Sequence, residues 1–522
     1  MNKKIHHINK QFIELHVPSE STAFALQNRI EVLTKETIPK MMESLFDSLC
    51  VNDQYIIANK LEIDLGEIKL EQFEKEFSNK LIERLGDMLS KNETVSQMNT
   101  ISDTVNNAEN PFIINPQAHL IESLLFFILN GYLQWNHIQF SDEEIMAVCD
   151  ASNNEEANHH LNQLKIFLTS SDRHLTLFLK RLSSGVTEKI SDKLFPLASQ
   201  LHKSRLKITE ILSEIKLAKL NGSELKEIFL KTIVQSDIDQ LTETTYKLIA
   251  ERIAILLISK YNKNEIADLL ITLNIKLHTV SETEDKQSFI ILTSLIKKLH
   301  ALFANPETIY EDGFQEQSSI KQKAENLKNK DRDKHKKQIE QKIKKEDKPA
   351  EAEGLYIANA GLVLYHPFIS EWLKSLNCFN SKGEWQYGKQ QRAVRLLQLL
   401  VSGEVNCPEY ELCLNKIFCG LELNDEIESE IILSPEEIES AEMLMKAVIK
   451  HWQALGESSI AGLQETFIQR TGKLFFENGN WQLQCEEKTV DILLNKLPWS
   501  ISIIKLPWME QMLRVQWEIK SF

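Results

Sequence analysis

The chain has 522 residues, which is too long for a single hydrophobic core and predicts roughly two to four domains. Apolar residues make up 42% and charged residues 26%, so the composition is that of globular protein and excludes wholesale disorder. The net charge of −15 argues against general binding to nucleic acid or to membrane surfaces. Seven thinly spread cysteines argue against a disulfide framework and favour a reducing compartment.

The sequence shows no secretion or membrane signal. The first residues are basic, but Glu14, Pro18 and Glu20 interrupt any apolar signal core. The longest apolar run, residues 124–129, has six residues, whereas a membrane-spanning helix needs about 20. We therefore expect synthesis in the cytoplasm, no signal peptide and no membrane insertion.

Residues 1–90 predict a small β-α-β-α module. Alternating apolar residues predict strands over 12–17 and 55–65, and helical spacing predicts helices after Pro18 and over 70–89, with a kink or break at Pro39. Two strands are too few for an independent sheet. We therefore expect a partner chain or another copy of this chain to complete it, so that the N-terminal strands support self-association.

The middle of the chain predicts two linkers around a helical array. Residues 91–116 are polar and predict a linker, and residues 117–310 predict a train of helices that stop signals divide into hairpins. Residues 311–353 form a charged linker. Within it, residues 320–348 hold twelve Lys/Arg against six Asp/Glu and no aromatic residue to stack a base, so a solvated linker is favoured over an RNA or lipid contact.

Residues 354–522 predict a compact α+β domain with a β-hairpin. Gly403 is placed as the C-cap of a helix over 390–400, and Ser434 and Glu437 form a capping box with proline at the first helical position. Asn478-Gly479 predicts a tight hairpin turn between 473–476 and 481–485. The fold class expected for the whole chain is therefore mainly α, with α+β ends.

Several segments of the chain resemble the contractile injection system tape measure protein family. They are 360–368 (AGLVLYHPF), 410–420 (YELCLNKIFCG), 467–474 (FIQRTGKL), the two LPW motifs at 497–499 and 506–508, and, near the N-terminus, 27–31 (QNRIE) and 61–66 (LEIDLG). The resemblance implies a structural component of a phage-tail-like bacterial particle. Such a protein would lie in or near the lumen of the inner tube at the baseplate end and set tube length.

Three functions remain open at this point. The first is the tape measure, with inner tube and baseplate or spike subunits as partners and no cofactor. The second is an assembly chaperone or baseplate adaptor of the same machine that never enters the tube. The third is an effector enzyme carried as cargo, which would need an active-site constellation, and the sequence offers none. We therefore expect no enzyme activity and no nucleic-acid partner.

The candidate binding surface is the repeated LPW motif with the tryptophan that follows it. Its residues are Pro498, Trp499, Pro507, Trp508 and Trp517. Proline favours exposed edges, and tryptophan offers a large area with one polar group, although these indoles are as well suited to the domain core.

The histidines and cysteines of the chain predict no catalytic or metal site. His366 has no acid or nucleophile at a recognisable spacing and is better read as structural. The four cysteines at 378, 407, 413 and 419 form no pair with zinc-site spacing and are expected to be buried thiols.

Overall fold

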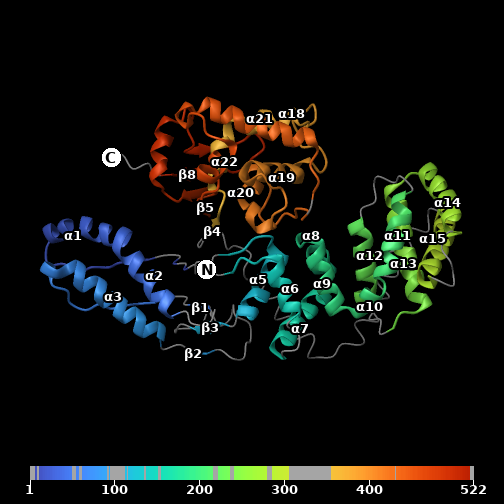
Figure 1. Ribbon diagram of the computed structural model, residues 1–522, viewed down its shortest axis with the longest axis horizontal. Coiled ribbons are helices and arrows are strands. Elements are labelled where there is room, and N and C mark those ends of the chain that lie inside the picture. The colour runs from blue at the N-terminus through green and yellow to red at the C-terminus, as the bar shows by residue number, and fades with distance from the viewer. Residues whose placement is uncertain are drawn as a thin grey trace.

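The computed structural model is mainly helical, with short strands near both ends of the chain (Figure 1). It describes residues 6, 8, 11–49, 55–57, 61–90, 93–94, 112–114, 116–134, 137–150, 155–214, 222–235, 240–278, 285–304, 354–429 and 431–517, and all that follows concerns these. The expected fold class, mainly α with a C-terminal α+β region, is confirmed. The charged linker at 311–353 and most of the polar linker at 91–116 lie outside the described residues.

The N-terminal arm, residues 11–49 and 61–90, is a pair of long helices. The first runs without interruption through α1 (Glu20–Val32), a π-helical turn (Leu33–Thr37) and α2 (Ile38–Leu49). The π turn comes directly before Pro39, which lacks an amide hydrogen to donate, so the helix bulges there instead of breaking. The second is α3 (Phe73–Ser90), which follows a 3-10 turn (Leu70–Gln72). Arg29 of α1 forms an ion pair with Glu74 of α3.

The predicted strand over 12–17 is wrong, because these residues join no strand ladder. Their burial still alternates, and Ile13, Leu15 and Val17 pack on the apolar cluster between the two helices. The predicted strand over 55–65 is seen only as β1 (Tyr55–Ile57). It pairs antiparallel with β3 (Phe112–Ile114), and β3 pairs parallel with β2 (Glu93–Thr94). The physical reason is that a strand needs ladder hydrogen bonds to a second strand, and among the described residues 12–17 form none.

The helices from Pro116 onward pack into two groups. The first group surrounds a core that includes Leu124, Phe127 and Phe178. It comprises α5 (Pro116–Asn130), α6 (Asp142–Asp150), α7 (Glu155–Ser170), α8 (Asp172–Arg181) and α9 (Ser184–Leu194).

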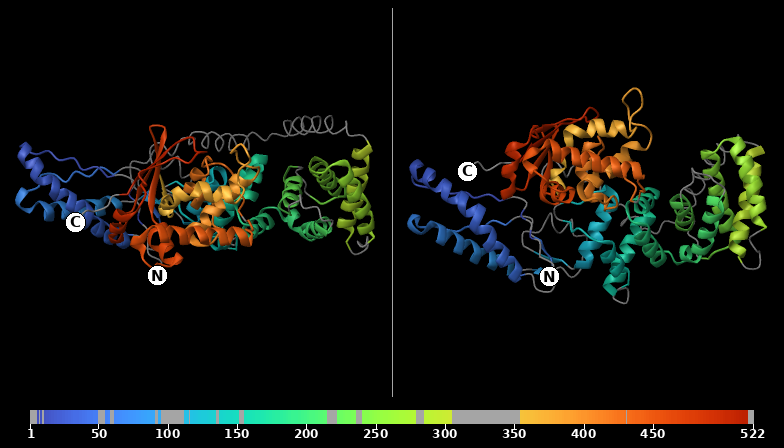
Figure 2. Two further views of the ribbon diagram at one scale, coloured as in Figure 1. Left: turned by 90° about the horizontal axis from the view of Figure 1, so that it is seen from above. Right: turned by 45° about the horizontal axis from the view of Figure 1, so that its top comes forward.

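The second group surrounds its own core, which includes Ile249, Leu257 and Leu295. Leu230 of this group belongs instead to the core of the first group, so the two groups are in contact. It comprises α10 (Pro196–Gln200), α11 (His202–Glu214), α12 (Gly222–Gln235), α13 (Glu243–Lys260), α14 (Lys263–Leu277) and α15 (Lys286–Ala304). In Figures 1 and 2 this group projects from one side of the molecule and the N-terminal arm from the other.

The C-terminal domain contains a five-stranded mixed sheet in the order β4-β5-β6-β8-β7. Its strands are β4 (Leu355–Ile357), β5 (Gly472–Glu477), β6 (Asn480–Cys485), β7 (Ile503–Ile504) and β8 (Leu513–Gln516). Its α-helices are α18 (His366–Ser375), α19 (Lys389–Ser402), α20 (Cys413–Phe418), α21 (Pro435–His451) and α22 (Ile460–Leu463). Its 3-10 and π turns are Ala360–Tyr365, Glu409–Leu412, Gln453–Leu455, Gln464–Ile468 and Thr489–Lys496.

The local signals of this domain are confirmed. β5 and β6 form the expected hairpin, and both turn residues, Asn478 (φ 52) and Gly479 (φ 76), have the positive φ that a tight turn needs. Gly403 caps α19 with φ 78. The Ser434 and Glu437 capping box opens α21.

The C-terminal domain and the first helical group share a continuous interior. Phe126 and Tyr132, at the end of α5, belong to the C-terminal core, and Tyr410 of the C-terminal domain belongs to the core of the first group. The Tyr410 hydroxyl donates to the carbonyl of Phe140 at 2.8 Å. We call this continuous unit, residues 116–194 with 354–517, the joined core. In Figure 1 the C-terminal domain lies directly above α5–α8.

Candidate protein-binding surface

Trp508, in the second LPW motif, is half-buried and held by its indole. Its N–H donates to the carbonyl of Phe418 at 2.8 Å, and Phe418 is the last residue of α20, where carbonyls lack helical partners. Its ring packs against Phe379 and Trp385, with centroids 4.8 and 5.2 Å away. Gly420 accommodates this approach, since a Cβ there would lie 2.8 Å from the Trp508 carbonyl oxygen. Trp508 therefore fastens the end of α20 to the C-terminal loops.

Trp499, in the first LPW motif, plays the same part elsewhere in the domain. Its N–H donates to the carbonyl of Leu364 at 3.1 Å, in the 3-10 turn before α18. Its half-buried ring meets Phe368 edge-on at 5.2 Å. The two motifs therefore use one device, an indole N–H that satisfies a carbonyl of a short helical turn.

Trp517 lies inside the domain. Its N–H donates to Asp491 at 3.0 Å, and its ring lies under the Arg470 guanidinium at 5.3 Å. Arg470 and Asp491 form a buried ion pair with two hydrogen bonds, at 2.9 and 3.1 Å. Trp517 therefore shields this ion pair and is not available to a partner.

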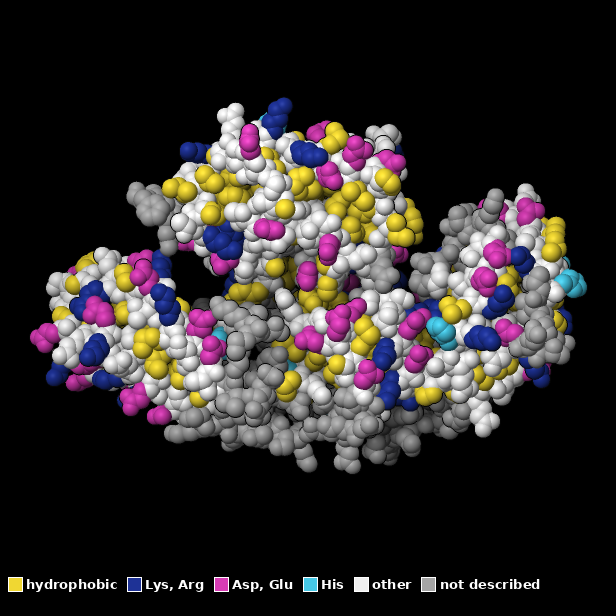
Figure 3. All heavy atoms as spheres, in the orientation of Figure 1, with side chains coloured by type: hydrophobic (Ala, Val, Ile, Leu, Met, Phe, Trp, Pro, Cys, Tyr) yellow, Lys and Arg dark blue, Asp and Glu magenta, His cyan; other side chains and the backbone are white. Residues whose placement is uncertain are grey.

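The structure separates the predicted surface residues. Trp499 contacts Phe368 in the first turn of α18, whereas Trp508 contacts Phe379, four residues beyond the last residue of that helix. The seven residue steps from Phe368 to Ser375, the last residue of α18, alone span roughly 10 Å at about 1.5 Å per residue. Pro498 and Pro507 are exposed beside their half-buried tryptophans. Figure 3 shows hydrophobic side chains gathered over the face of the C-terminal domain in that view.

Sequence reasoning missed an aromatic loop next to Trp508. Phe379 and Trp385 face each other across an isolated β-bridge, and Tyr387 beyond them is fully exposed. The signal available was three aromatic residues within nine positions around the turn residues Asn380 and Gly383. This loop packs against Trp508, and with the two LPW motifs, which lie at separate points, it gives the C-terminal domain an aromatic face rather than a pocket.

Sequence reasoning also missed a set of buried charges. Glu409 lies between Lys416, its partner at 2.5 Å, and Arg181 of α8, at 3.3 Å, with all three side chains fully buried. Burial lowers the pKa of Lys416, and the carboxylate of Glu409 opposes that effect. The signal was charge within otherwise apolar segments, as in residues 412–418. This set joins the first helical group to the C-terminal domain and offers no route to solvent.

His366 and the cysteines show geometry suited to structure. His366 Nδ1 lies 3.0 Å from the carbonyl oxygen of Val363, and burial lowers the pKa of its imidazole. Burial likewise raises the pKa of Cys407 and Cys413 to about 12. A thiol with so high a pKa carries almost no thiolate at neutral pH, so these cysteines are poor nucleophiles. Among the described residues, no group of three or more His, Cys, Asp or Glu side chains could hold a metal ion.

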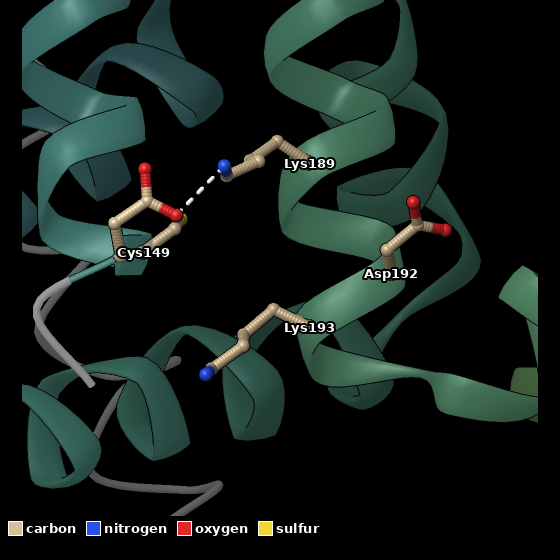
Figure 4. Close-up of a pocket in the computed structure, with 5 residues that line it drawn as sticks. Cys149, Lys189, Asp192 and Lys193 are labelled. Carbon is tan, nitrogen blue, oxygen red and sulfur yellow. Dashed lines mark ion pairs between the residues drawn. The ribbon is translucent and has the colours of Figure 1, made fainter. Parts of the chain in front are cut away.

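One open pocket of ≈ 260 Å³ lies between α6 and α9 (Figure 4). Asp150 pairs with Lys189 at 2.7 Å, and Asp192 and Lys193 complete the polar wall. Burial raises the pKa of the Cys149 thiol beside them. Two of the charges that line the pocket thus pair with each other, and the raised pKa of its thiol does not favour an activated nucleophile.

Comparison with known protein families identifies the family of the chain. A family model of the contractile injection system tape measure protein matches residues 5–517. The chain belongs to this family, whose members are structural components of an injection particle. No curated protein and no solved structure matches the chain. No helix in the described part of the chain is long and apolar enough to span a bilayer.

Proposed function

We propose that this tape measure protein sets the length of the inner tube through the stretch between α9 and β4. The observation that carries the proposal is the path of the chain. It leaves the joined core after α9, forms the second helical group and the charged linker, and returns to the joined core at β4. Residues 196–353 thus begin and end at the joined core, which Leu230 of α12 also contacts.

A loop held at both ends can extend only out and back. Its roughly 160 residues would span about 240 Å as one straight helix, but only about 120 Å as a helical hairpin. Each residue added to this loop is therefore expected to lengthen the tube by about 0.75 Å, half the rise of a single helix.

The experiment is electron microscopy of particles that carry an in-frame duplication of α13–α15. Sixty-odd added residues should lengthen the tube by about 45 Å. The matched control is an insertion of equal length at the exposed turn around Gly383, outside the loop, which should leave length unchanged. Tubes of unchanged length with the duplication would overturn length-setting.

The alternative is an assembly chaperone or baseplate adaptor that never enters the tube. The observation that favours it is the compact joined core, which a ruler would not require. Mass spectrometry of purified intact particles separates the two roles. A chain retained in the particle supports the tape measure in the tube lumen or at the baseplate, and an absent chain supports the chaperone.

The proposed contact with tube or baseplate subunits is the aromatic face around the two LPW motifs. Pro498, Pro507 and Tyr387 are its exposed members, and Trp499 and Trp508 lie half-buried beneath. The double variant Pro498→Glu and Pro507→Glu puts charge on this face without touching an indole. It should abolish co-purification with those subunits, whereas Met443→Glu, on the exposed side of α21, should not.

A further inference from the structure

The segment at residues 13–17 of the N-terminal arm has the burial pattern of an edge strand but belongs to no strand ladder in the described part of the chain. Ile13, Leu15 and Val17 are half-buried against the helices, while Glu14 and His16 are 86% and 93% exposed. This alternation has the period of two that a strand requires. The segment joins no ladder, and the arm that carries it projects from the rest of the molecule in both views of Figure 2. An edge of this kind is a template for another extended chain.

We propose that the occupant is a second copy of this chain, paired antiparallel through the same segment with Leu15 opposite Leu15. The two copies would be related by a two-fold axis through this pair, so every contact would occur twice. Their apolar faces would join into one layer over both helix pairs.

The register follows from the side chains. Shifting the pairing by one residue would place Ile13, Leu15 and Val17 opposite exposed positions, so only registers that keep the apolar faces together remain. A two-fold axis through Glu14 would set the two Glu14 carboxylates opposite each other. An axis through His16 would set the two His16 side chains opposite each other and each Glu14 opposite Pro18. Centring on Leu15 sets each Glu14 against His16 and each Ile13 against Val17. Glu14 and His16 lie 3.5 Å apart within one chain, so in this register the two copies would bring both pairs together. This register alone sets an imidazole, which can donate a hydrogen bond, against each carboxylate and keeps apolar residues opposite one another.

The other extended segment of the arm is unsuited to self-pairing. Ile63 and Leu65 face the helices, but the alternate positions are Glu62 and Asp64, so every self-register sets acid against acid. Asp64 also accepts a hydrogen bond from the amide of Gly66 at 2.8 Å, which fixes its orientation. The charge pattern therefore selects residues 13–17 and a copy of themselves.

The test is sedimentation velocity of the purified full-length chain over a range of concentrations. The wild type should dimerise, and H16E should weaken dimerisation at least tenfold, because it sets a carboxylate against Glu14 of the second copy twice over. The double variant E14K with H16E sets a positive charge at position 14 opposite a negative charge at position 16 of the second copy, so it should recover the dimer. The matched control is H300E, the same substitution at an exposed histidine of α15, which should have no effect.

Three outcomes would overturn the pairing. In the first, the wild type stays monomeric at every concentration, even if it binds tube subunits. In the second, H16E leaves the dimerisation unchanged. In the third, the double variant does not restore the dimerisation that H16E removes. The proposed pairing goes beyond length-setting and is measured on the isolated protein. Tubes of unchanged length would therefore not contradict the pairing, and a monomeric protein would not contradict length-setting.

Discussion

Arg181 Nε lies 3.3 Å from Glu409 Oε2, and both side chains are fully buried between α8 and the C-terminal domain. Arg181 also donates to the carbonyls of Ile128 at 2.8 Å and Asn424 at 2.7 Å, so its guanidinium connects three segments distant in sequence. Nearby, on the surface, Lys180 pairs with Glu426 at 2.6 Å. The joined core thus has one buried and one exposed ion pair across the same junction.

Glu409→Gln should destabilise the joined core by about 3–5 kcal/mol, because it leaves Arg181 and Lys416 buried without a counter-charge. Glu426→Gln removes the exposed pair of the same junction and should cost under about 1 kcal/mol. Urea unfolding followed by circular dichroism measures both. Equal, small losses would show that the buried pair does not hold the junction.

Two glycine substitutions should have opposite effects. A Cβ on Gly361 would lie 1.9 Å from the Phe467 carbonyl oxygen, so Gly361→Ala must displace backbone and should cost at least about 3 kcal/mol. Gly185 lies in α9 with open space around it, and Gly185→Ala should stabilise by about 0.4–1 kcal/mol through the unfolded chain. The melting temperatures of the two variants should therefore shift in opposite directions. A tolerated Gly361→Ala would contradict the close backbone approach.

Trp508→Phe should cost about 1–3 kcal/mol, because it leaves the carbonyl of Phe418 without its donor. Trp385, in ring contact with Trp508, provides the matched control. Its indole N–H is buried with no acceptor among the described residues, so Trp385→Phe removes an unsatisfied donor and should cost less. Thermal unfolding should rank the two variants in this order. The reverse order would mean that ring packing, not the hydrogen bond, dominates.

The pH dependence of stability should include a contribution from His137. Burial, with a smaller effect from His119, lowers the pKa of this imidazole to about 3, and its ring stacks on Phe126 at 4.3 Å. Because the unfolded chain takes up a proton near pH 6.5 and the folded chain does not, this contribution is present above about pH 6.5 and is lost as pH falls toward 3. The slope can reach at most about 1.4 kcal/mol per pH unit.

His137→Phe keeps an aromatic ring against Phe126 and removes the titration, so it should flatten the acid limb of melting temperature against pH. His300→Gln, at an exposed position, should leave that limb unchanged. If melting temperature falls equally steeply with decreasing pH in both variants, groups other than His137 cause the loss of stability in acid.

The sequence by itself determined the turns and helix ends, because the residues that form them are neighbours in the chain. The turn at Asn478 and Gly479 needs only two residues with positive φ, and the box of Ser434 and Glu437 closes within one helical turn. The C-cap at Gly403 is equally local. These short-range interactions hold whatever the rest of the chain does.

Tertiary structure decided which side chains face inward and which elements meet. Ile438 lies at helical spacing from the buried Ala441 and Met445, yet it is exposed. Glu437 beside it turns inward instead, to the Ser434 amide and Arg392. Residues 12–17 show strand alternation, but a ladder needs hydrogen bonds to a second strand, and in the described part of the chain they form none. The separation of Trp499 from Trp508 and the meeting of Arg181 with Glu409 likewise depend on segments far apart in sequence, whose approach no local pattern encodes.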